Sequence, residues 1–224
     1  MTKLYVAVAF LALTSAGAAR ADIVGGAVTG GTAQTAGGVF VALTTPLMNL
    51  FGTPDSVGND NFQSPNLFAF NEAQNFTLTA PLVLDSGSIA AGTIVSSQYV
   101  FFDPGPGKRV IGTVDFGSDI LAIITRTGTL VTSDFLGASG VNYVNTTNRG
   151  LEAGDSVTLN GPSEILVDVF ASSPGDYVRV ITAGTTATAT VPEPSSIVLV
   201  GVGLGASLVG LTRRRRALNS HRVA

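Results

Sequence analysis

The chain has 224 residues, of which 12% are charged and 45% hydrophobic, and it contains no cysteine. It therefore forms neither disulfides nor Cys-based zinc sites, and its single histidine, His221, excludes most chemistry that relies on imidazole. Between Asp22 and Val191 it carries fourteen acidic and five basic residues, a formal charge of −9. This acidic body argues against a nucleic-acid partner, because phosphate backbones require basic surface.

Residues 1–21 have the parts of a secretory signal peptide. Lys3 supplies the positive start, an uncharged apolar run follows, and Ala19 and Ala21 fit a small-x-small cleavage site. The apolar run is too short to span a bilayer of about 30 Å, so a retained anchor is not expected. The alternative is a buried N-terminal helix. We expect signal peptidase to cut after Ala21 and leave Asp22 as the mature N-terminus.

The next 160 residues predict a β-rich body. Residues 22–38 are dense in glycine, which predicts a loosely ordered leading segment or an edge strand. Over residues 39–183, short β-branched and aromatic runs alternate with turn signals such as "DPGPGK" and "EAGD". This spacing is typical of an antiparallel sandwich or jelly roll. The predicted fold class is therefore all-β, flanked by an N-terminal signal helix and a C-terminal transmembrane helix.

Several runs in the body predict individual strands. Residues 76–84 alternate apolar and polar side chains, which predicts one half-buried strand. Residues 110–116 likewise place Val and Phe on one face and Thr and Asp on the other. Residues 120–125 are almost entirely apolar, which predicts a strand covered on both faces. Residues 164–170 and 176–182 flank the turn signal "ASSPG", which predicts an antiparallel hairpin.

The tail begins with a Thr/Ala-rich linker, residues 184–191, followed by Pro192, Glu193 and Pro194. Proline fixes its own backbone angle and pushes the preceding residue toward extended conformations. The motif therefore joins neither a helix nor the middle of a sheet, and it offers an extended strip of the kind that proteases and transpeptidases read. A stiff linker is the alternative for this motif taken alone.

Residues 195–212 predict a transmembrane helix. The uncharged core of this stretch covers roughly 22 Å as a helix, and its flanks extend it to about 27 Å, which suits a thin bilayer. Four glycines weaken it, so we expect a transient anchor. Each arginine costs about 2.5–3.5 kcal/mol at mid-membrane, and the positive-inside rule places the basic run and residues 217–224 in the cytoplasm. The stop-transfer residues are Arg213, Arg214, Arg215 and Arg216.

Pro-Glu-Pro, a short apolar helix and an arginine cluster, in that order over residues 192–216, resemble the PEP-CTERM sorting signal of Gram-negative bacteria. The resemblance implies that Pro192, Glu193 and Pro194 are recognised by a membrane-embedded exosortase. It implies an inner-membrane intermediate and then release or transfer of the body to the cell surface or the extracellular space. It also implies a surface or matrix protein associated with the exopolysaccharide of a biofilm.

A carbohydrate-binding module, assisted by calcium, is the alternative function. Asp115 and Asp119 surround a glycine turn, and residues 55–61 are rich in Asp and Asn, so both stretches offer oxygen ligands that calcium prefers. Asx turns explain the same residues equally well, and no other cofactor is expected. Sugar binding needs exposed aromatic rings, and core packing is the competing use for most of the candidates. The candidates are Tyr99, Phe101, Phe102, Tyr143 and Tyr177.

A polysaccharide hydrolase is ranked below the matrix protein and the carbohydrate-binding module. Glycoside hydrolysis needs two carboxylates facing each other across a cleft. Glu72, Glu152, Glu164 and the aspartates offer many pairs, but no motif selects one. The chain also lacks a Gly-x-Ser-x-Gly elbow, a P-loop and a His-Glu-x-x-His helix. We therefore expect no enzymatic activity and name no catalytic residue.

Overall fold

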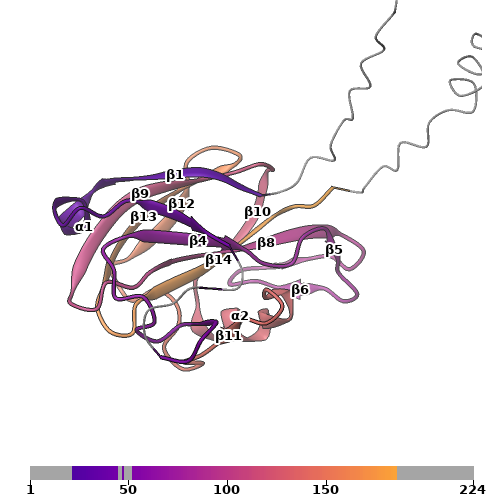
Figure 1. Ribbon diagram of the computed structural model, residues 1–224. Coiled ribbons are helices and arrows are strands. Elements are labelled where there is room, and N and C mark those ends of the chain that lie inside the picture. The colour runs from indigo at the N-terminus through magenta and orange to yellow at the C-terminus, as the bar shows by residue number, and fades with distance from the viewer. Residues whose placement is uncertain (1–21, 45–46, 48–51, 186–224) are drawn as a thin grey trace, which may run out of the picture. The chain divides into compact units, whose positions relative to one another are not determined.

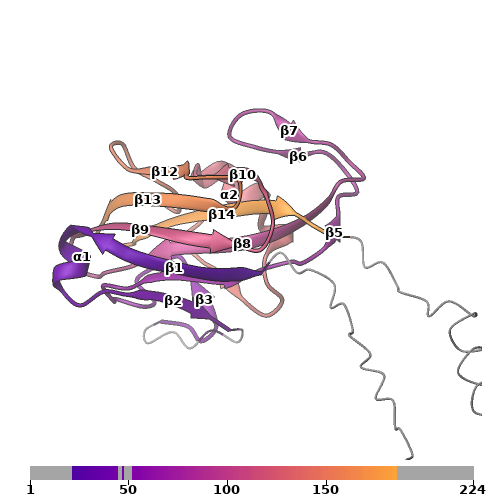
Figure 2. The same ribbon diagram turned by 90° about the horizontal axis from the view of Figure 1, so that it is seen from above.

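The computed structural model describes residues 22–44, 47 and 52–185, which form a body built mainly from two β-sheets (Figures 1 and 2). The body is mostly β-sheet, as predicted, while the two predicted flanking helices lie outside the described residues. The first sheet, called sheet A here, is antiparallel throughout. Its strands, in spatial order, are β1 (Ile23–Gly30), β9 (Lys108–Phe116), β13 (Glu164–Ala171) and β12 (Ser156–Leu159).

The second sheet, sheet B, is mixed, because β2 runs parallel to β4 while the other neighbours are antiparallel. Its strands, in spatial order, are β10 (Ile120–Ile124), β14 (Asp176–Ala183), β8 (Ile94–Phe102), β4 (Leu67–Asn71) and β2 (Phe40–Leu43), and β5 (Phe76–Thr77) also pairs with β8. The smaller elements are β3 (Ser56–Val57) with β11 (Asn142–Tyr143), β6 (Leu82–Val83) with β7 (Ser88–Ile89), α1 (Gly31–Thr35), α2 (Thr127–Thr132) and the 3₁₀ helix η1 (Asp134–Leu136).

The two sheets pack face to face through one aliphatic core. In β9, Val110, Gly112, Val114 and Phe116 are buried while the alternate residues are partly exposed, so the alternation predicted for residues 110–116 is confirmed. Strand β13 shows the same alternation, with Val167 and Val169 turned inward. Sheet A therefore has one face in the core and one face toward solvent, and this explains the alternation of apolar and polar residues along its strands.

A second core covers the opposite face of sheet B. Successive residues of β8 point to opposite faces: Val100 packs toward sheet A, whereas Tyr99 and Phe101 pack toward the second core. This second core is closed by Leu130 of α2 and Leu136 of η1, together with the surrounding loops. Strands β8 and β14 are consequently buried on both faces, and the body has three layers (Figure 1).

The prediction of one continuous strand over residues 76–84 is wrong. Leu78 and Leu82 are buried, but Ala80 between them is exposed, and the hydrogen bonding is not continuous. Strand β5 pairs with β8, whereas β6 pairs with β7. Pro81 lies between β5 and β6, and proline has no backbone N–H to donate to a ladder.

Two further strand predictions are wrong for a topological reason. Residues 120–125 contain β10, which is an edge strand of sheet B with Leu121 exposed, so it is not covered on both faces. Strands β13 and β14 do not form a hairpin, because β13 pairs in sheet A and β14 in sheet B. The turn between them carries the chain from one layer to the other.

The glycine-rich leading segment contains β1 and α1, and β1 is the edge strand of sheet A that the sequence allowed. Close packing explains one of its glycines. A Cβ at Gly26 would lie 2.7 Å from the Phe40 ring and 2.7 Å from the Thr113 carbonyl oxygen. Glycine therefore lets β2 and β9 approach this strand.

Candidate functional site

Both ends of the described body are bound to the end of β4 and the loop that follows it. Asn71 accepts a hydrogen bond from the Ile23 N–H at 3.2 Å and donates one to the Asp22 carboxylate at 3.2 Å. Asn75 accepts a hydrogen bond from the Thr185 N–H at 2.8 Å. The first and last described residues of the body are therefore held close to one short loop.

The turn between β9 and β10 also binds both ends of the described body. The Gly117 N–H donates to the Asp22 carbonyl at 2.8 Å, and the Ala183 N–H donates to the Asp119 carbonyl at 2.8 Å. Figures 1 and 2 show the start of β1 and the end of β14 at the same end of the body. We call this end, with Asp22, residues 71–75, residues 117–119 and residues 183–185, the exit end.

Most of the residues predicted to direct sorting lie outside the described residues. These are Ala19 and Ala21 of the signal cleavage site, Pro192, Glu193 and Pro194 of the motif, the helix over 195–212 and Arg213, Arg214, Arg215 and Arg216. Asp22 is described and is partly buried at the exit end. Within the described part of the chain, no helix is long and apolar enough to cross a membrane.

The two calcium candidates lie near each other in sequence but not in one ligand set. Asp115 is on β9, opposite Gly25 on one neighbouring strand and Glu164 on the other, while Asp119 is exposed in the following turn. Among residues 22–44, 47 and 52–185, no group of three or more acidic or histidine side chains is placed to hold a metal ion.

The other calcium candidate, residues 55–61, makes local and long-range hydrogen bonds. The Asn61 amide donates to Ser56 at 3.0 Å, and Asp60 accepts from the Ser173 hydroxyl. Asp60 also has a backbone with positive φ, as asparagine and aspartate tolerate in turns. These contacts give the stretch a structural use as a turn.

The aromatic residues proposed for sugar binding pack in the cores. Tyr99, Phe101, Phe102 and Tyr177 are almost completely buried. Phe101 stacks on Tyr177 with ring centroids 5.6 Å apart, and Tyr143 contacts Tyr99 edge-on at 5.2 Å. The rings therefore form an aromatic cluster in the interior, and core packing is the use that the structure gives them.

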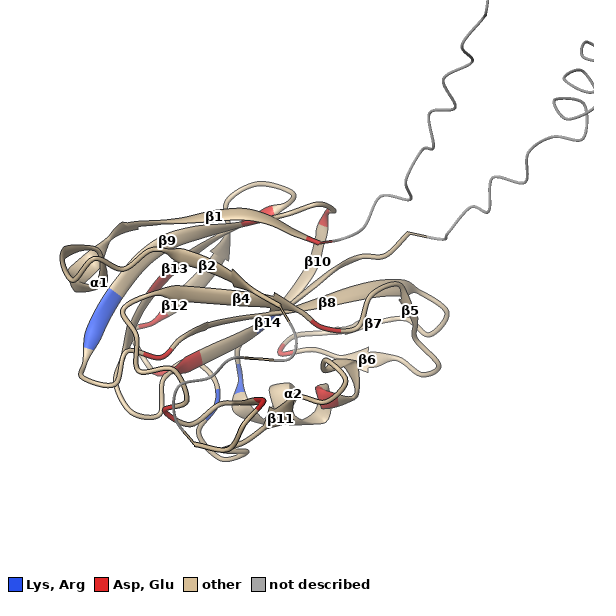
Figure 3. Ribbon diagram, in the orientation of Figure 1, with Lys and Arg blue, Asp and Glu red and all other residues tan. Residues whose placement is uncertain are grey.

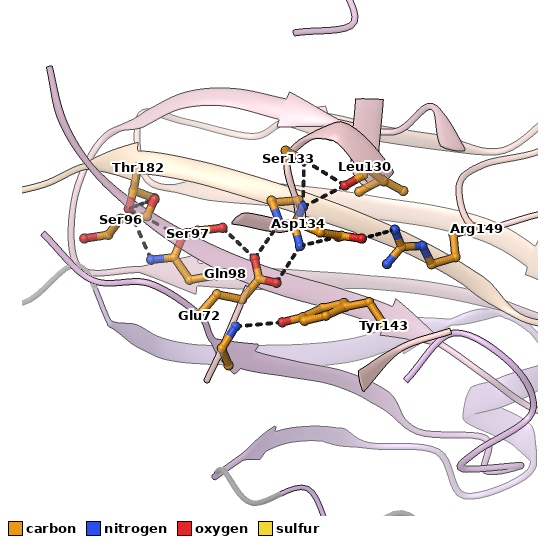
Figure 4. A network of polar contacts seen from close by, with 12 residues as sticks. Glu72, Ser96, Ser97, Gln98, Leu130, Ser133, Asp134, Tyr143, Arg149 and Thr182 are labelled. Atoms are coloured by element: carbon orange, nitrogen blue, oxygen red, sulfur yellow. Dashed lines mark hydrogen bonds and ion pairs between the residues drawn. The ribbon is translucent and has the colours of Figure 1, made fainter. Parts of the chain in front are cut away.

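A buried ion pair, which the sequence did not reveal, joins two segments of sheet B and belongs to a larger polar network (Figure 4). Arg179 of β14 binds Glu72 through two parallel hydrogen bonds of 2.6 and 2.7 Å, and both side chains are fully buried. The Ser97 hydroxyl donates to Glu72 at 2.5 Å. Burial alone would lower the pKa of Arg179, but the charge and hydrogen bonds of Glu72 outweigh it and raise that pKa. Arg179 therefore stays charged.

The network continues from Arg179 into α2, η1 and the loop beyond. Arg179 donates to the Leu130 carbonyl at 3.0 Å, to Ser133 at 2.6 Å and to Asp134 at 3.2 Å. Asp134 also accepts from Arg149, another fully buried arginine, at 2.6 Å. One guanidinium thus ties the third layer to the middle of sheet B. The only signal in the sequence was an arginine inside the otherwise apolar run "YVRVIT".

Two buried carboxyl groups lie at the end of the sheets opposite the exit end. Burial raises the pKa of Asp176 to about 8, and the charges of Asp155 and Glu152 add to this effect. Burial likewise raises the pKa of Asp103 to about 6, although the Phe62 N–H donates to Asp103 at 2.9 Å and opposes the shift. The Oδ2 atom of Asp176 has no hydrogen-bond partner in the described body.

The three glutamates considered for hydrolysis, Glu72, Glu152 and Glu164, lie apart. Glu72 is committed to the buried network, Glu164 lies on β13 at the exit end, and Glu152 lines a shallow hollow at the opposite end with Phe170 and Asp176. Acidic positions of the described body are spread over several elements, while basic positions are few and do not form one face (Figure 3).

Comparison with known proteins places the sorting signal at the C-terminus. The family model described as the PEP-CTERM protein-sorting motif matches residues 190–216. No curated protein and no solved structure matches the chain. The match covers the tail and leaves the β-rich body outside it.

The chain therefore carries a PEP-CTERM sorting signal, as its sequence predicted. Such a signal marks an exported protein that is targeted to an exosortase and directed through the membrane to the cell surface. Pro192, Glu193 and Pro194 lie within the matched residues, and so do the four arginines from 213 to 216.

Proposed function

We propose that this protein is a non-enzymatic surface or matrix component whose body is exported, held briefly at the membrane by its tail and then processed. Signal peptidase cuts after Ala21, the helix over 195–212 spans the inner membrane, and Arg213 to Arg216 stop it on the cytoplasmic side. Exosortase then acts at Pro192, Glu193 and Pro194. The released or transferred body associates with extracellular polysaccharide.

The observation that best supports this proposal is that the first and last residues of the described body, Asp22 and Thr185, both lie at the exit end. Asp22 and Thr185 are each held by side chains of the same loop, so both processing steps fall outside the folded sheets. From Thr185, the chain reaches Pro192 over a span of at most about 25 Å. A cut at either site leaves the strands and both cores intact.

The test is the intact mass of the protein recovered outside the cell. We expect an N-terminus at Asp22 and a C-terminus near Pro192–Pro194. The Glu193→Ala variant should keep its arginine cluster and remain in the membrane fraction. Glu152→Ala, at an exposed position of the body, is the matched control and should be processed normally. Secreted protein that retains Arg213 to Arg216 would overturn the proposal.

A carbohydrate-binding module is the second candidate, and one observation favours it. Phe170 is 55% exposed beside the hollow lined by Glu152, Ser172, Ser173 and Asp176. An exposed ring next to hydroxyl and carboxyl groups is the arrangement that sugar binding uses. The calcium candidates Asp115 and Asp119 lie at the exit end and not beside this hollow, so calcium is tested separately from the sugar contact.

A glycan array with and without chelator tests the second candidate. Selective retention that falls in Phe170→Ser supports a binding module, and loss on chelation supports calcium assistance. Release of reducing ends from matrix glycan would instead indicate a hydrolase. Activity that survives replacement of every Asp and Glu in turn excludes the body as its source.

A further inference from the structure

Three exposed aliphatic side chains lie at the exit end. Val24 is 66% exposed, Leu121 is 42% exposed and Leu159 is 58% exposed. They come from three different edge strands, β1, β10 and β12, that are far apart in the sequence. Large apolar side chains exposed at one end of a body are candidates for contact with a partner surface.

Strand register places all three at the end where the chain enters and leaves the body. Val24 follows Ile23, which pairs with Phe116 at the end of β9. Leu121 follows Ile120, which pairs with Thr182 near the end of β14.

Leu159 lies at the same end because its strand finishes beside the β9–β10 turn. It pairs with Ile165 near the start of β13. The turn that follows β12 is bound to the β9–β10 turn by two backbone hydrogen bonds: the Ile120 N–H donates to the Pro162 carbonyl at 2.7 Å, and the Phe116 N–H donates to the Ser163 carbonyl at 2.8 Å.

The length of the tail identifies the surface that meets this end. Ten positions separate Thr185 from Ser195, where the apolar stretch of the sorting signal begins, so even a fully extended linker spans at most about 35 Å. Because the linker leaves from the exit end, that end is the part of the body tethered nearest to the bilayer. Apolar tips at an interface sit at the boundary of headgroups and acyl chains.

We propose that the exit end docks on the lipid bilayer through Val24, Leu121 and Leu159 while the sorting tail is inserted. This inference rests on the membrane-spanning tail of the proposed function. Docking holds the body against the membrane, which keeps the Pro-Glu-Pro motif beside a membrane-embedded processing enzyme. Cutting of the tail removes the tether, and three aliphatic contacts then hold the body only weakly.

Charge at the exit end selects the kind of lipid. Asp119 is exposed in the β9–β10 turn, and Asp115 and Glu164 pair across β9 and β13 near the same end. Anionic headgroups repel these carboxylates, so docking is stronger on zwitterionic than on anionic vesicles. Raising the salt concentration should reduce this difference, because screening weakens the repulsion.

The absence of cysteine in the chain permits a direct test with single-cysteine variants of the full-length protein. Three variants are labelled with the same environment-sensitive fluorophore and reconstituted in proteoliposomes of zwitterionic lipid: Val24→Cys, Leu121→Cys and Leu159→Cys. Nitroxide-labelled lipid reports contact by quenching. Val39→Cys is the matched control, since Val39 is 55% exposed and precedes β2 at the opposite end, and Phe170→Cys is a second control.

We expect quenching at positions 24, 121 and 159 to be several-fold greater than at positions 39 and 170. Ser207→Cys, inside the apolar stretch, measures insertion of the tail separately. Quenching at 207 with equal, weak quenching at both ends of the body overturns docking and leaves the proposed function intact. Lack of quenching at 207 overturns the membrane-spanning tail itself.

Discussion

The two sheets of this body differ in what surrounds them. Sheet A has one face in the core and one in solvent, and its ion pair between Arg109 and Asp168 is largely exposed. The central strands of sheet B, β8 and β14, are covered on both faces, and the ion pair between Arg179 and Glu72 is fully buried. The two pairs have the same bidentate geometry, yet their surroundings give them very different effects on stability.

The largest expected effect is that of Arg179→Met. The change leaves Glu72 buried with no cation and removes a bond from Asp134, so the free energy of unfolding should fall by about 3–5 kcal/mol. Urea denaturation followed by circular dichroism measures the loss. A loss no larger than that of an exposed pair would contradict the assignment of this network to the interior.

The double variant Glu72→Met with Arg179→Met sharpens the comparison. Removing both charges avoids an unpaired ion in the interior, and apolar replacements of similar size fill the space. The double variant should therefore recover most of the stability lost in Arg179→Met. Equal destabilisation of the single and double variants would show that the bonds to α2 and η1, and not the charge pair, carry the effect.

Asp176→Asn should raise the free energy of unfolding at pH 8, because it removes a carboxyl group that burial disfavours in its charged form. Since the folded-state pKa is about 8 and the ordinary value is 3.8, the unfolded chain loses this proton first. Stability should fall as the pH rises from about 4 to 8 and then level off.

Thermal unfolding of both proteins between pH 4 and 9 measures this dependence. The Asn variant should lack the part of the slope that extends above pH 6, while Asp103, whose pKa is about 6, keeps its own contribution at lower pH. Parallel pH profiles for the two proteins would show that Asp176 ionises normally in the folded state.

The smallest expected effect is that of Arg109→Met, the counterpart of Arg179→Met on sheet A. The hydrogen bond to Asp168, together with its charge, raises the pKa of Arg109, but the guanidinium is exposed to water, which screens the pair. Stability should be unchanged within the error of urea denaturation, in both low and high salt. A loss similar to that of Arg179→Met would remove the distinction drawn between the two sheets.

Local pattern was enough to predict the β-rich class and the inward face of residues 110–116, because a strand with one solvated face alternates every second residue. For the glycine-rich residues 22–38 it left two alternatives, a loosely ordered segment or an edge strand, and the structure contains the edge strand β1 there. The sorting tail was also readable, because its three parts are contiguous and need no partner from elsewhere in the chain. The Pro-Glu-Pro motif, the apolar stretch and the arginines function through their order along the sequence.

Only the tertiary structure decided which strands are neighbours and where the charges go. The sequence alone could not show that β13 and β14 belong to different sheets, that residues 120–125 form an edge, or that Arg179 meets Glu72 across 107 positions. The sequence also could not show that Asn71, Asn75 and residues 117–119 bind the two ends of the described body. These contacts depend on long-range packing around two cores, which no local periodicity encodes.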